Sequence, residues 1–408
     1  MSEHTGLKVT IIGGGIAGLF AARVLREKHH VTILERSSGG NEVGAAVTPG
    51  PNATRILDQY GWDPSRCGAL VLGKTRTMDH NGNLIKETDL SNIKKAFGSD
   101  WHVVHRIDLW NELLRLATAP SEDLGIRGLP AKVEWRAEVV DVDTESGDVK
   151  LGDGMVVPSD LVIGADGIKS TTRHLVVGKE GDQPRPSGAS IFRFILPRET
   201  VEKVDSQTID PSRPAELTLR IALDGSRRTI VSYPCRNHEL LNIGCIAPNS
   251  LIDLPPADSW VAPGEKADLL RVFGDFHFRP LLEQAEDIKL WELRDHDPLP
   301  TYIKGRLVLI GDGAHAMTPH QGQGASQAIE DGEGLSLFID QVVSRQTVPE
   351  ILRDFDRARR VRASKIQLIT RHVHEETSAE AMWKNQQYNF TYRGIRDALA
   401  RQDAGQEV

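Results

Sequence analysis

Short runs of apolar and β-branched residues recur along the chain and predict the strands of a buried sheet. They cover residues 8–12, 31–35, 133–142, 161–165 and 306–311. Near-continuous apolar runs of this length are typical of parallel strands that are covered on both faces. An amphipathic stretch separates the first two runs, so the chain opens with a predicted strand, helix and strand.

Other segments alternate polar with apolar residues. Residues 70–103 and about 180–292 show this alternation together with repeated Pro, Asn and Gly turns, which predicts antiparallel strands. The runs TIVSYPCR and LLNIGCIA, joined by NHE, predict a hairpin in which Cys235 and Cys245 are small packing residues.

From Pro349 onward the periodicity is helical. The Arg-rich segment RDFDRARRVRASK in this part resembles a basic binding patch, but acidic residues stand beside its arginines. Interspersed charges of this kind indicate a solvated helix face, which is the interpretation we adopt.

Composition narrows the class of protein. The 408 residues, 39% of them hydrophobic, can form real cores, and a net charge of -8 gives no positive field that would attract nucleic acid or anionic lipid. Three cysteines are too few for a disulfide framework, and no apolar run approaches the ~20 residues of a membrane span. The first residues lack the order of a signal peptide, so we expect a cytoplasmic protein without nucleic-acid or membrane partners.

The turn between the first strand and helix has the spacing of a dinucleotide site. In VTIIGGGIAGLF, Gly13 permits a tight turn, Gly15 lets a pyrophosphate approach the backbone, and Gly18 permits close packing of helix on strand. The helix N-terminus favours an anion there. Glu35 ends the second strand, where a carboxylate can accept hydrogen bonds from an adenosine ribose. This motif alone leaves NAD and FAD both open.

Two later turns distinguish the cofactors. Asp166 in LVIGADGIKSTTR and Asp312 in RLVLIGDGAHAMTPHQGQGASQAIED both end buried strands, where ligands of α/β sheets bind. Ser170 and Arg173 follow at spacings that can begin a helix. The loop 322–324 then offers free N–H groups and a helix start, which would stabilise negative charge on a reduced flavin.

These blocks, together with His105–Arg106 before DLWNELL, resemble the single-component FAD-dependent aromatic hydroxylases, the para-hydroxybenzoate and salicylate hydroxylase-like monooxygenases. The resemblance spans residues 9 to about 340. It implies that Glu35 binds the adenosine ribose, that Arg106 lies near the pyrophosphate and ribityl chain, and that Asp312 binds the ribityl hydroxyls. Asp166 would shape the approach of cofactor and nicotinamide.

The resemblance also implies a set of cofactors and the residues that hold FAD. NADH or NADPH would be a transient reductant, since no second G-x-G-x-x-G is present, and O2 a co-substrate. Oxygen would be delivered to an electron-rich ring through a C4a-hydroperoxyflavin. The expected FAD-binding residues are Gly13, Gly15, Ala17, Gly18, Glu35, Arg36, Ala46, Arg106, Asp166, Asp312, Pro319, Gly322, Gly324 and Ala325.

The expected fold is α/β. It consists of a Rossmann-type, glutathione-reductase-like FAD-binding domain, an inserted antiparallel-sheet substrate domain and a C-terminal helical segment. The expected boundaries are residues 1–70, 104–178 and 293–345 for the FAD-binding domain, 71–103 and 179–292 for the substrate-binding sheet, and 346–408 for the C-terminal helices.

Two departures from the family limit what can be transferred. Gly313 stands where the family more often has Ala, which should matter little to the acid before it. The loop GNEVGAAVTPGPN after Glu35 has no Arg or His, so a catalytic or flavin-gating polar residue that some relatives place there must lie elsewhere or be absent.

Three residues are candidates for the chemistry. On the inserted sheet, Arg193 could pair with a substrate carboxylate or phenolate, and Tyr233 could hydrogen-bond the same oxygen. His320 could accept a proton near the flavin. His315 is interpreted as a structural loop residue, and the scattered histidines predict no metal site.

Three functions are compatible with these residues. The leading hypothesis is the hydroxylation of a small phenolic or salicylate-like molecule by a monomer or homodimer. The same oxygen donor could instead epoxidise an alkene or hydroxylate an indole or polyketide ring. A binding protein that retains a dinucleotide fold without redox work is the third hypothesis, and the Asp312 loop argues against it.

Overall fold

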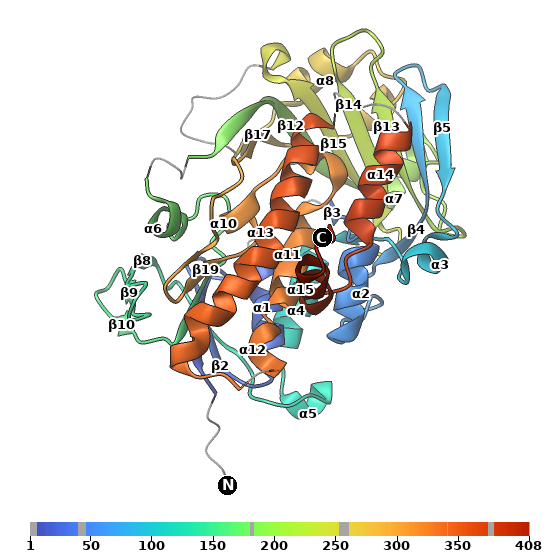
Figure 1. Cartoon of the computed structure of the whole chain (residues 1–408). Coiled ribbons are helices and arrows are strands. Elements are labelled where there is room, and N and C mark those ends of the chain that lie inside the picture. Colours follow the sequence, from blue (N-terminus) through green and yellow to red (C-terminus); the bar gives the residue numbers. More distant parts are fainter. Residues whose placement is uncertain are drawn as a thin grey trace.

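The chain forms a six-stranded sheet, a ten-stranded sheet and a small three-stranded sheet, as Figure 1 shows for a computed structural model. Helices pack on and between the first two, which are called the smaller and the larger sheet below. The structure describes residues 6–39, 46–179, 183–252, 261–340, 342–373 and 379–407. Residues 40–45, the first part of the loop that lacks Arg and His, lie outside the described residues. In the view of Figure 1 the smaller sheet lies at the lower left and the larger one at the upper right.

The smaller sheet contains the predicted parallel strands in the order β18-β19-β11-β1-β2-β7. Only the outer pair β18 and β19 is antiparallel. Buried β-branched residues dominate its central strands, as expected for strands covered on both faces. The strand bounds are β1 Lys8–Ile12, β2 His30–Glu35, β7 Lys132–Trp135, β11 Leu161–Gly164, β18 Ile303–Lys304 and β19 Leu307–Leu309.

The prediction of one strand over residues 133–142 is wrong. β7 ends at Trp135, and Arg136 adopts a left-handed conformation with φ 59°, which turns the chain out of the sheet. The remainder forms β8 Val139–Val142, which belongs to a three-stranded antiparallel sheet with β9 Val149–Leu151 and β10 Val156–Val157. Apolar content alone does not reveal such a break.

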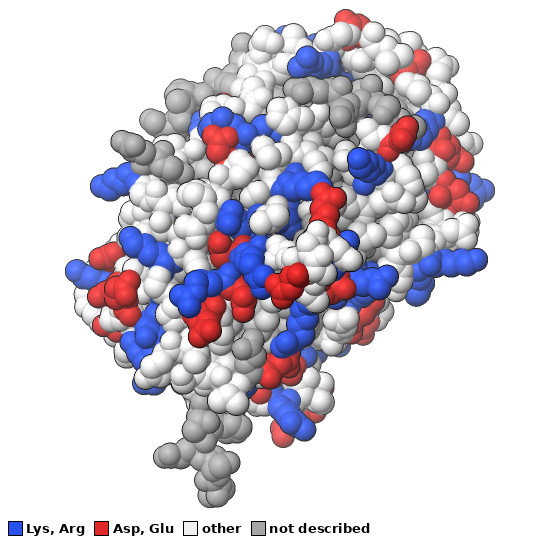
Figure 2. Space-filling view, in the orientation of Figure 1, with Lys and Arg blue, Asp and Glu red and all other residues white. Residues whose placement is uncertain are grey.

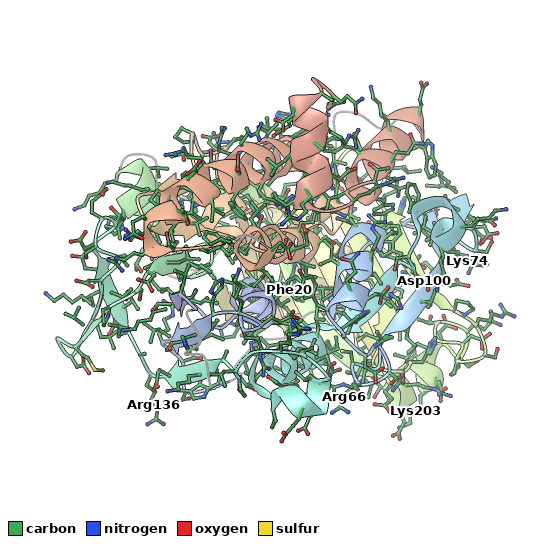
Figure 3. The ribbon with its side chains drawn as sticks, turned by 60° about the horizontal axis from the view of Figure 1, so that its bottom comes forward. Phe20, Arg66, Lys74, Asp100, Arg136 and Lys203 are labelled. Carbon is green, nitrogen blue, oxygen red and sulfur yellow. The ribbon has the colours of Figure 1, made fainter. Side chains whose placement is uncertain are left out.

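Three helices cover one face of the parallel sheet. α1 Ile16–Leu25 follows β1 and packs against α4 Arg106–Thr118 and α11 Gly324–Gly334. Gly332 makes the contact with α11 possible, because a Cβ there would lie 2.5 Å from the Phe20 ring. The fully buried Phe20 lies within this layer in Figure 3.

The larger sheet has ten strands, and most of its pairs are antiparallel as predicted; β4 and β13 pair in parallel. The predicted hairpin is present, with Tyr233 opposite Asn242, and Cys235 and Cys245 are fully buried. The strand bounds are β3 Ala46–Val47, β4 Leu70–Asp79, β5 Leu84–Asp89, β6 His102–His105, β12 Arg185–Pro197, β13 Ala215–Ile221, β14 Thr229–Cys235, β15 Leu240–Pro248, β16 Val261–Pro263 and β17 Lys289–Asp295.

The two faces of this sheet have different surroundings. One face carries a buried apolar cluster that includes Phe192, Phe194 and Ile243 and is covered by α7 Arg198–Val204, α8 Lys266–Phe273 and α9 Arg279–Leu282. The opposite face carries Arg193, and many of its side chains are only half-buried. The second face is therefore less completely covered by protein than the first.

The Arg-rich segment lies on α13 Val348–His372, which crosses the front of the molecule over α11 (Figure 1). Our interpretation of this segment as a solvated face is wrong for two of its arginines: Arg359 and Arg362 are 0% and 2% exposed. They pair with Glu330 and Asp331 of α11. Its outward charges are interspersed with acids in Figure 2, as the prediction had it.

The remaining elements are short helices between the strands and the helices of the C-terminal part. Among the described residues, no helix is long and apolar enough to cross a membrane, and no group of three or more His, Cys, Asp or Glu residues could hold a metal ion. The bounds are α2 Pro51–Gln59, α3 Ile93–Phe97, α5 Ser121–Leu124, α6 Arg173–Val177, η1 Asn249–Leu251, α10 Asp312–His315, η2 Pro319–Gln321, α12 Leu337–Asp340, η3 Arg345–Thr347, α14 Ala379–Phe390 and α15 Ile395–Asp403.

Candidate active site

The glycine turn between β1 and α1 has the predicted geometry. Gly13 has φ +107°, and a Cβ there would lie 2.4 Å from the Ala165 carbonyl oxygen. Gly15 caps α1 without a side-chain hydrogen bond, and nothing lies within 4 Å of a Cβ built on it. Gly18 packs so tightly that a Cβ would lie 2.0 Å from the Gly13 oxygen. The turn thus leaves an uncapped helix N-terminus facing open space.

Glu35 and Trp110 hold this turn in place. The Glu35 Oε2 accepts a hydrogen bond of 2.7 Å from the Gly14 N–H, and its Oε1 accepts one of 2.7 Å from the Ser37 N–H. From α4, the Trp110 indole N–H donates to the Gly14 oxygen at 2.7 Å. Each Glu35 oxygen retains a lone pair for a ribose hydroxyl. Arg36, beside it, is exposed.

The three predicted turns converge at the carboxyl ends of β1, β11 and β19, which are adjacent strands. A Cβ on Gly311, whose φ is +59°, would lie 2.8 Å from the Ala17 Cβ. A Cβ on Gly313 would lie 3.5 Å from an Asp166 carboxylate oxygen. The turn that carries Asp312 therefore lies directly beside the start of α1, which is the arrangement on which the predicted site depends.

Asp166 and Asp312 differ in their surroundings. Asp166 accepts hydrogen bonds from the backbone N–H groups of Thr171 and Thr172 at 2.7 and 3.0 Å, and from the Thr172 hydroxyl at 2.9 Å, just before α6 begins at Arg173. Its carboxylate thus braces its own loop. Asp312 is exposed, and its carboxylate has no hydrogen-bond partner among the described residues.

The loop after Asp312 ends in a second uncapped helix N-terminus. Pro319 and His320 form the 3-10 turn η2 and are half-buried. Gly322 has φ +62°, and a Cβ there would lie 2.5 Å from the Thr48 hydroxyl, so only glycine fits this turn. Gly324 begins α11 with nothing within 4 Å of its Cβ position, and Ala325 is half-buried.

Asp331 of α11 supports the Asp312 turn from below. Its Oδ2 accepts the Gly311 N–H at 2.8 Å and lies 2.6 Å from the His315 Nε2, while its Oδ1 accepts from Arg359 at 2.9 Å. Burial favours its neutral form, but the charges of His315 and Arg359 outweigh burial and lower its pKa. His315 is fully buried, in agreement with a structural interpretation.

Glu330, the residue before Asp331, joins α11 to α2 and α13. It accepts from Asn52 Nδ2 at 2.7 Å and Arg362 at 2.8 and 2.9 Å, and it pairs with Arg359. Burial is again outweighed by the two guanidinium charges, so its pKa is lowered. Our sequence analysis missed this buried charge cluster, although the ED pair after the glycine loop was a signal for it.

Arg106, the first residue of α4, brings the two sheets into electrostatic contact. Burial lowers the pKa of its guanidinium, the Asp312 carboxylate opposes that shift, and the Arg193 charge adds to it. Both charges act on Arg106, so Asp312 and Arg193 each lie near its guanidinium. The structure thus brings together a residue from each of α4, the Asp312 turn and the larger sheet.

Tyr233 of β14 and Asn242 of β15 hold the edge strand β3 in place. The Tyr233 hydroxyl donates to the Ala46 oxygen at 2.8 Å, and the Asn242 side chain accepts from the Ala46 N–H at 3.1 Å. The predicted cofactor residue Ala46 therefore has both backbone polar groups engaged by protein side chains. Because the proton of Tyr233 is committed to Ala46, only the lone pairs of its oxygen are available to a substrate.

Arg193 is a half-buried cation without an acidic partner among the described residues. Its guanidinium lies 5.9 Å from the centre of the Trp291 ring, and no carboxylate of the described residues lies within ion-pair distance. Burial lowers its pKa, and the nearby Tyr233 opposes the shift. Such a group is costly to bury, which marks the position as one where an anion would be stabilised.

The crevice suits a flavin dinucleotide. The uncapped N-terminus of α1, with open space over Gly15, offers a site for a diphosphate. The uncapped N-terminus of α11, with open space over Gly324, offers a site for an anionic ring edge. Asp312, which has no hydrogen-bond partner among the described residues, offers a site for a polyol. Gly13, Gly15, Glu35, Arg106 and Asp312 would hold the group, and a bound flavin would supply redox chemistry and activation of O2.

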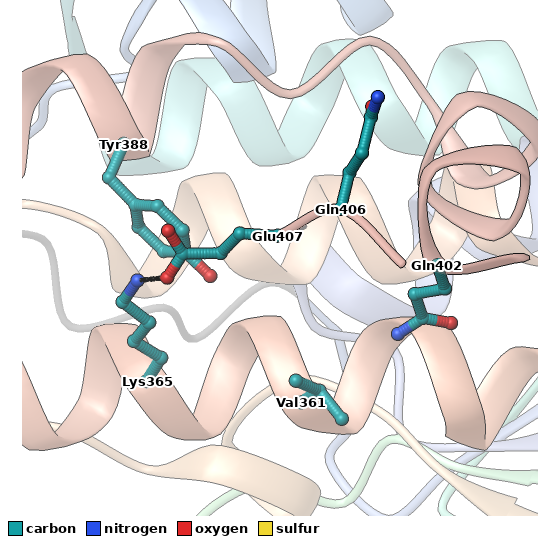
Figure 4. Close-up of a pocket in the computed structure, with 6 residues that line it drawn as sticks. All are labelled: Val361, Lys365, Tyr388, Gln402, Gln406 and Glu407. Carbon is teal, nitrogen blue, oxygen red and sulfur yellow. Dashed lines mark hydrogen bonds and ion pairs between the residues drawn. The ribbon is translucent and has the colours of Figure 1, made fainter. Parts of the chain in front are cut away.

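A second hollow lies outside the crevice, between α13, α14 and the C-terminal residues (Figure 4). Lys365 in its wall is paired with Glu407 and lies 3.9 Å from the centre of the Tyr388 ring. Its charges are thus already matched within the protein. The lining consists of Val361, Lys365, Tyr388, Gln402, Gln406 and Glu407.

Comparison with known proteins agrees with this geometry. The FAD binding domain family matches residues 6–191 and 269–369. Hispidin-3-hydroxylase of Neonothopanus nambi is 33% identical over 374 residues, covering 89% of this chain and 87% of that protein. Salicylate hydroxylase of Pseudomonas putida is 31% identical over 388 residues, covering 90% and 85%.

Solved structures show the same fold. A salicylate hydroxylase substrate complex matches with a TM-score of 0.71 at 26% identity, covering 98% of this chain and 94% of that one. CtdE in complex with FAD and a substrate matches with a TM-score of 0.78 at 21% identity, covering 98% of both chains. The chain therefore belongs to the FAD-binding-domain family of FAD-dependent monooxygenases, the family of the aromatic hydroxylases.

Proposed function

We propose that this monooxygenase consumes NADH or NADPH and O2 to hydroxylate a small, electron-rich aromatic molecule that carries an acidic group, a phenol or a carboxylate. The observation that carries the proposal is Arg193, a half-buried guanidinium without a carboxylate partner among the described residues. A phenolate or carboxylate in contact with it would supply the missing charge.

The wall around Arg193 has the composition of an aromatic pocket. Register places these side chains on one face, because Arg193 is opposite Gly244, and Gly244 is opposite Val231. Gly244 leaves a gap between flanking side chains, since a Cβ there would lie 3.0 Å from Ile191. The half-buried apolar residues on this face are Ile195, Leu217, Leu219, Val231, Ile246 and Trp291.

These residues can perform three parts of the reaction. The apolar wall excludes water and holds the ring. The Arg193 charge favours an ionised phenol, which makes the ring more nucleophilic. A flavin held by Gly13, Gly15, Glu35, Arg106 and Asp312 would supply the oxygen chemistry: one atom of O2 goes to the ring and the other leaves as water, with NADH or NADPH as the source of electrons. Tyr233, whose proton is donated to Ala46, contributes an acceptor for a substrate hydroxyl and fixes the strand β3.

His320 is our candidate for the proton acceptor beside the flavin. It lies in η2 between Pro319 and the start of α11, on the loop that borders the crevice. A pH–rate profile that is the same in wild type and His320→Asn would discard this role. Asp166, on the neighbouring turn, is our candidate for shaping the approach of the nicotinamide.

The test is turnover with product identification. FAD-loaded protein is mixed with NADH or NADPH in air, and phenolic acids, phenols and indoles are screened for faster oxidation and for a product heavier by about 16 mass units, one added oxygen atom. We expect acceleration by phenolic acids in wild type and its loss in Arg193→Ala. Unchanged product formation in Arg193→Ala would contradict the assignment of Arg193.

A second candidate function is oxygenation of a neutral indole, alkene or polyketide ring. The extent of the apolar wall favours it, since six half-buried apolar residues stand on the face that carries Arg193 and its register partner Lys289. The relatives include hispidin-3-hydroxylase and salicylate hydroxylase, whose names indicate phenolic substrates. The substrate screen distinguishes the two functions. We further propose a cytoplasmic monomer or homodimer with no nucleic-acid or membrane partner.

A further inference from the structure

Trp135, the last residue of β7, is an exposed aromatic side chain at the edge of the cofactor crevice. It is 36% exposed although it is large and apolar. Its register partner on the adjacent strand is Glu35, the acid that borders the glycine turn. The carboxyl ends of parallel strands are where ligands of such sheets bind, so Trp135 stands at the ligand edge and not at the opposite one.

Contacts connect Trp135 to the glycine turn. Its ring lies 6.3 Å from the ring of Trp110, and the planes are tilted by 46°. The Trp110 indole N–H in turn donates to the Gly14 oxygen at 2.7 Å. Only the Trp110 ring therefore lies between Trp135 and Gly14, whose N–H donates to Glu35.

The backbone after Trp135 is fixed to the residues around Glu35. The Arg136 N–H donates to the Ser37 oxygen at 3.0 Å, and the Ala137 N–H donates to the Glu35 oxygen at 3.0 Å. Arg136 is held with φ 59°, a left-handed backbone conformation that residues other than Gly, Asn and Asp rarely adopt. In Figure 3 Arg136 points outward from the end of β7. These bonds set the position of Trp135 relative to the Glu35 carboxylate.

We propose that the Trp135 indole is the stacking platform for the adenine of the bound FAD. The inference rests on FAD binding, which family membership shows. With the diphosphate at Gly15 and the ribose at Glu35, a base joined to that ribose would lie within reach of the side chains beside Glu35, and Trp135 is the register partner of Glu35. An exposed indole there offers a planar apolar surface, and stacking would cover its exposed ring.

The experiment measures binding of the adenine half separately from the flavin half. ADP is the probe for the adenine half, FMN is the probe for the flavin half, and dissociation constants are measured by calorimetry on apoprotein. For Trp135→Ala we expect ADP and FAD to bind about tenfold more weakly or worse, the usual cost of losing a base–aromatic stack. FMN affinity should stay the same. Trp135→Phe should restore most of the ADP affinity.

Trp383→Ala is the matched control, because Trp383 is also exposed, at 45%, but lies on α14 against Phe97. This variant should leave ADP and FAD affinity unchanged. A second readout is intrinsic fluorescence: ADP should alter the emission of wild type more strongly than that of Trp135→Phe, which retains Trp110 on the glycine turn.

Equal ADP affinity in wild type and Trp135→Ala would overturn the proposal, and so would an equal loss of ADP and FMN affinity, which would indicate a general structural defect. Wild-type protein that binds no FAD would contradict the cofactor assignment itself. The Phe variant keeps the test decisive if the Ala variant does not fold.

Discussion

Two arginine sites in this protein, one fully buried on α13 and one half-buried on β12, differ in what neutralises the charge. On α13, Arg359 and Arg362 face Glu330 and Asp331, and two guanidinium groups meet two carboxylates with almost no exposure. On β12, Arg193 has Trp291 and Tyr233 as neighbours and no carboxylate partner among the described residues.

The difference separates structure from ligand recognition. A buried ion cluster with matched charges holds elements together, and here it fixes α11, whose N-terminus borders the cofactor crevice. A buried cation without a partner is stable only if something else supplies the charge or if the rest of the fold bears the cost. We therefore assign the first site to the scaffold and the second to the substrate.

Breaking the matched cluster should have the largest effect. Glu330→Gln leaves two guanidiniums with one carboxylate and should lower the free energy of unfolding by about 3–5 kcal/mol, the usual cost of removing one partner of a buried pair. Denaturant unfolding of the apoprotein measures it. Asp354→Asn, in the exposed pair with Arg357, is the control and should change the unfolding free energy by less than about 0.5 kcal/mol. A small effect of Glu330→Gln would contradict the scaffold role.

Asp312 tests whether an unpartnered acid also marks a ligand site. Asp312→Ala should weaken FAD binding by about ten- to a hundredfold, since charged hydrogen bonds contribute roughly 1.5–3 kcal/mol. Thermal stability of the apoprotein should change little, because the exposed carboxylate has no hydrogen-bond partner among the described residues and acts on Arg106 only through its charge. Flavin fluorescence titration measures the affinity. A loss of apoprotein stability with unchanged FAD affinity would refute the assignment.

Glu333 is an intermediate case, a buried acid held by hydrogen-bond donors. It accepts from the Tyr392 hydroxyl at 2.8 Å and the Ile395 N–H at 2.9 Å, and burial raises its pKa from 4.5 to about 7. The folded state thus binds a proton that the unfolded state has lost between these pH values. The stability contribution of this group is present below pH 4.5 and is lost as the pH rises through about 7.

Glu333→Gln should remove that dependence. Unfolding midpoints of wild type and variant, measured from pH 5 to 8, should show wild type losing stability relative to the variant as the pH rises. A constant difference between the two proteins across this range would show that Glu333 does not titrate there.

Tyr233→Phe should have the smallest effect. It removes the hydrogen bond to Ala46, worth about 1 kcal/mol of unfolding free energy, and leaves the ring in place. The phenol proton is committed to Ala46, so the oxygen offers a substrate only a neutral acceptor. Substrate affinity should therefore fall less than threefold, which corresponds to a loss of under about 0.6 kcal/mol. A large loss of substrate affinity with unchanged stability would instead make the Tyr233 oxygen a main substrate ligand and not the weak acceptor proposed here.

The sequence predicted features whose causes are local. Gly13 and Gly18 have the predicted geometry because a tight turn and close packing depend on the absence of a side chain at fixed positions. The hairpin of β14 and β15 follows from alternation and a polar turn. Local patterns of this kind act through neighbours in the chain.

Features that depend on distant partners were missed or misassigned. In the sequence, the two buried arginines of α13 cannot be told from solvated ones, because the acids that pair with them lie on α11. Arg359 and Glu330 are 29 residues apart. The commitment of Tyr233 to Ala46, 187 residues away, is equally invisible in a strand pattern. The break after Trp135 depends on the backbone conformation of one residue, Arg136.

The central claim is tested most directly by ligand binding to Arg193→Met, which replaces the unpartnered charge by an apolar group of similar length. Dissociation constants are measured from flavin absorbance changes on FAD-loaded protein, for phenolic acids and for the matching neutral phenols. The account predicts that the variant binds the acids at least about tenfold more weakly, keeps its affinity for the neutral phenols, and is as stable as wild type or more so. Equal affinity for the acids in both proteins, or a large loss of stability in the variant, would contradict it.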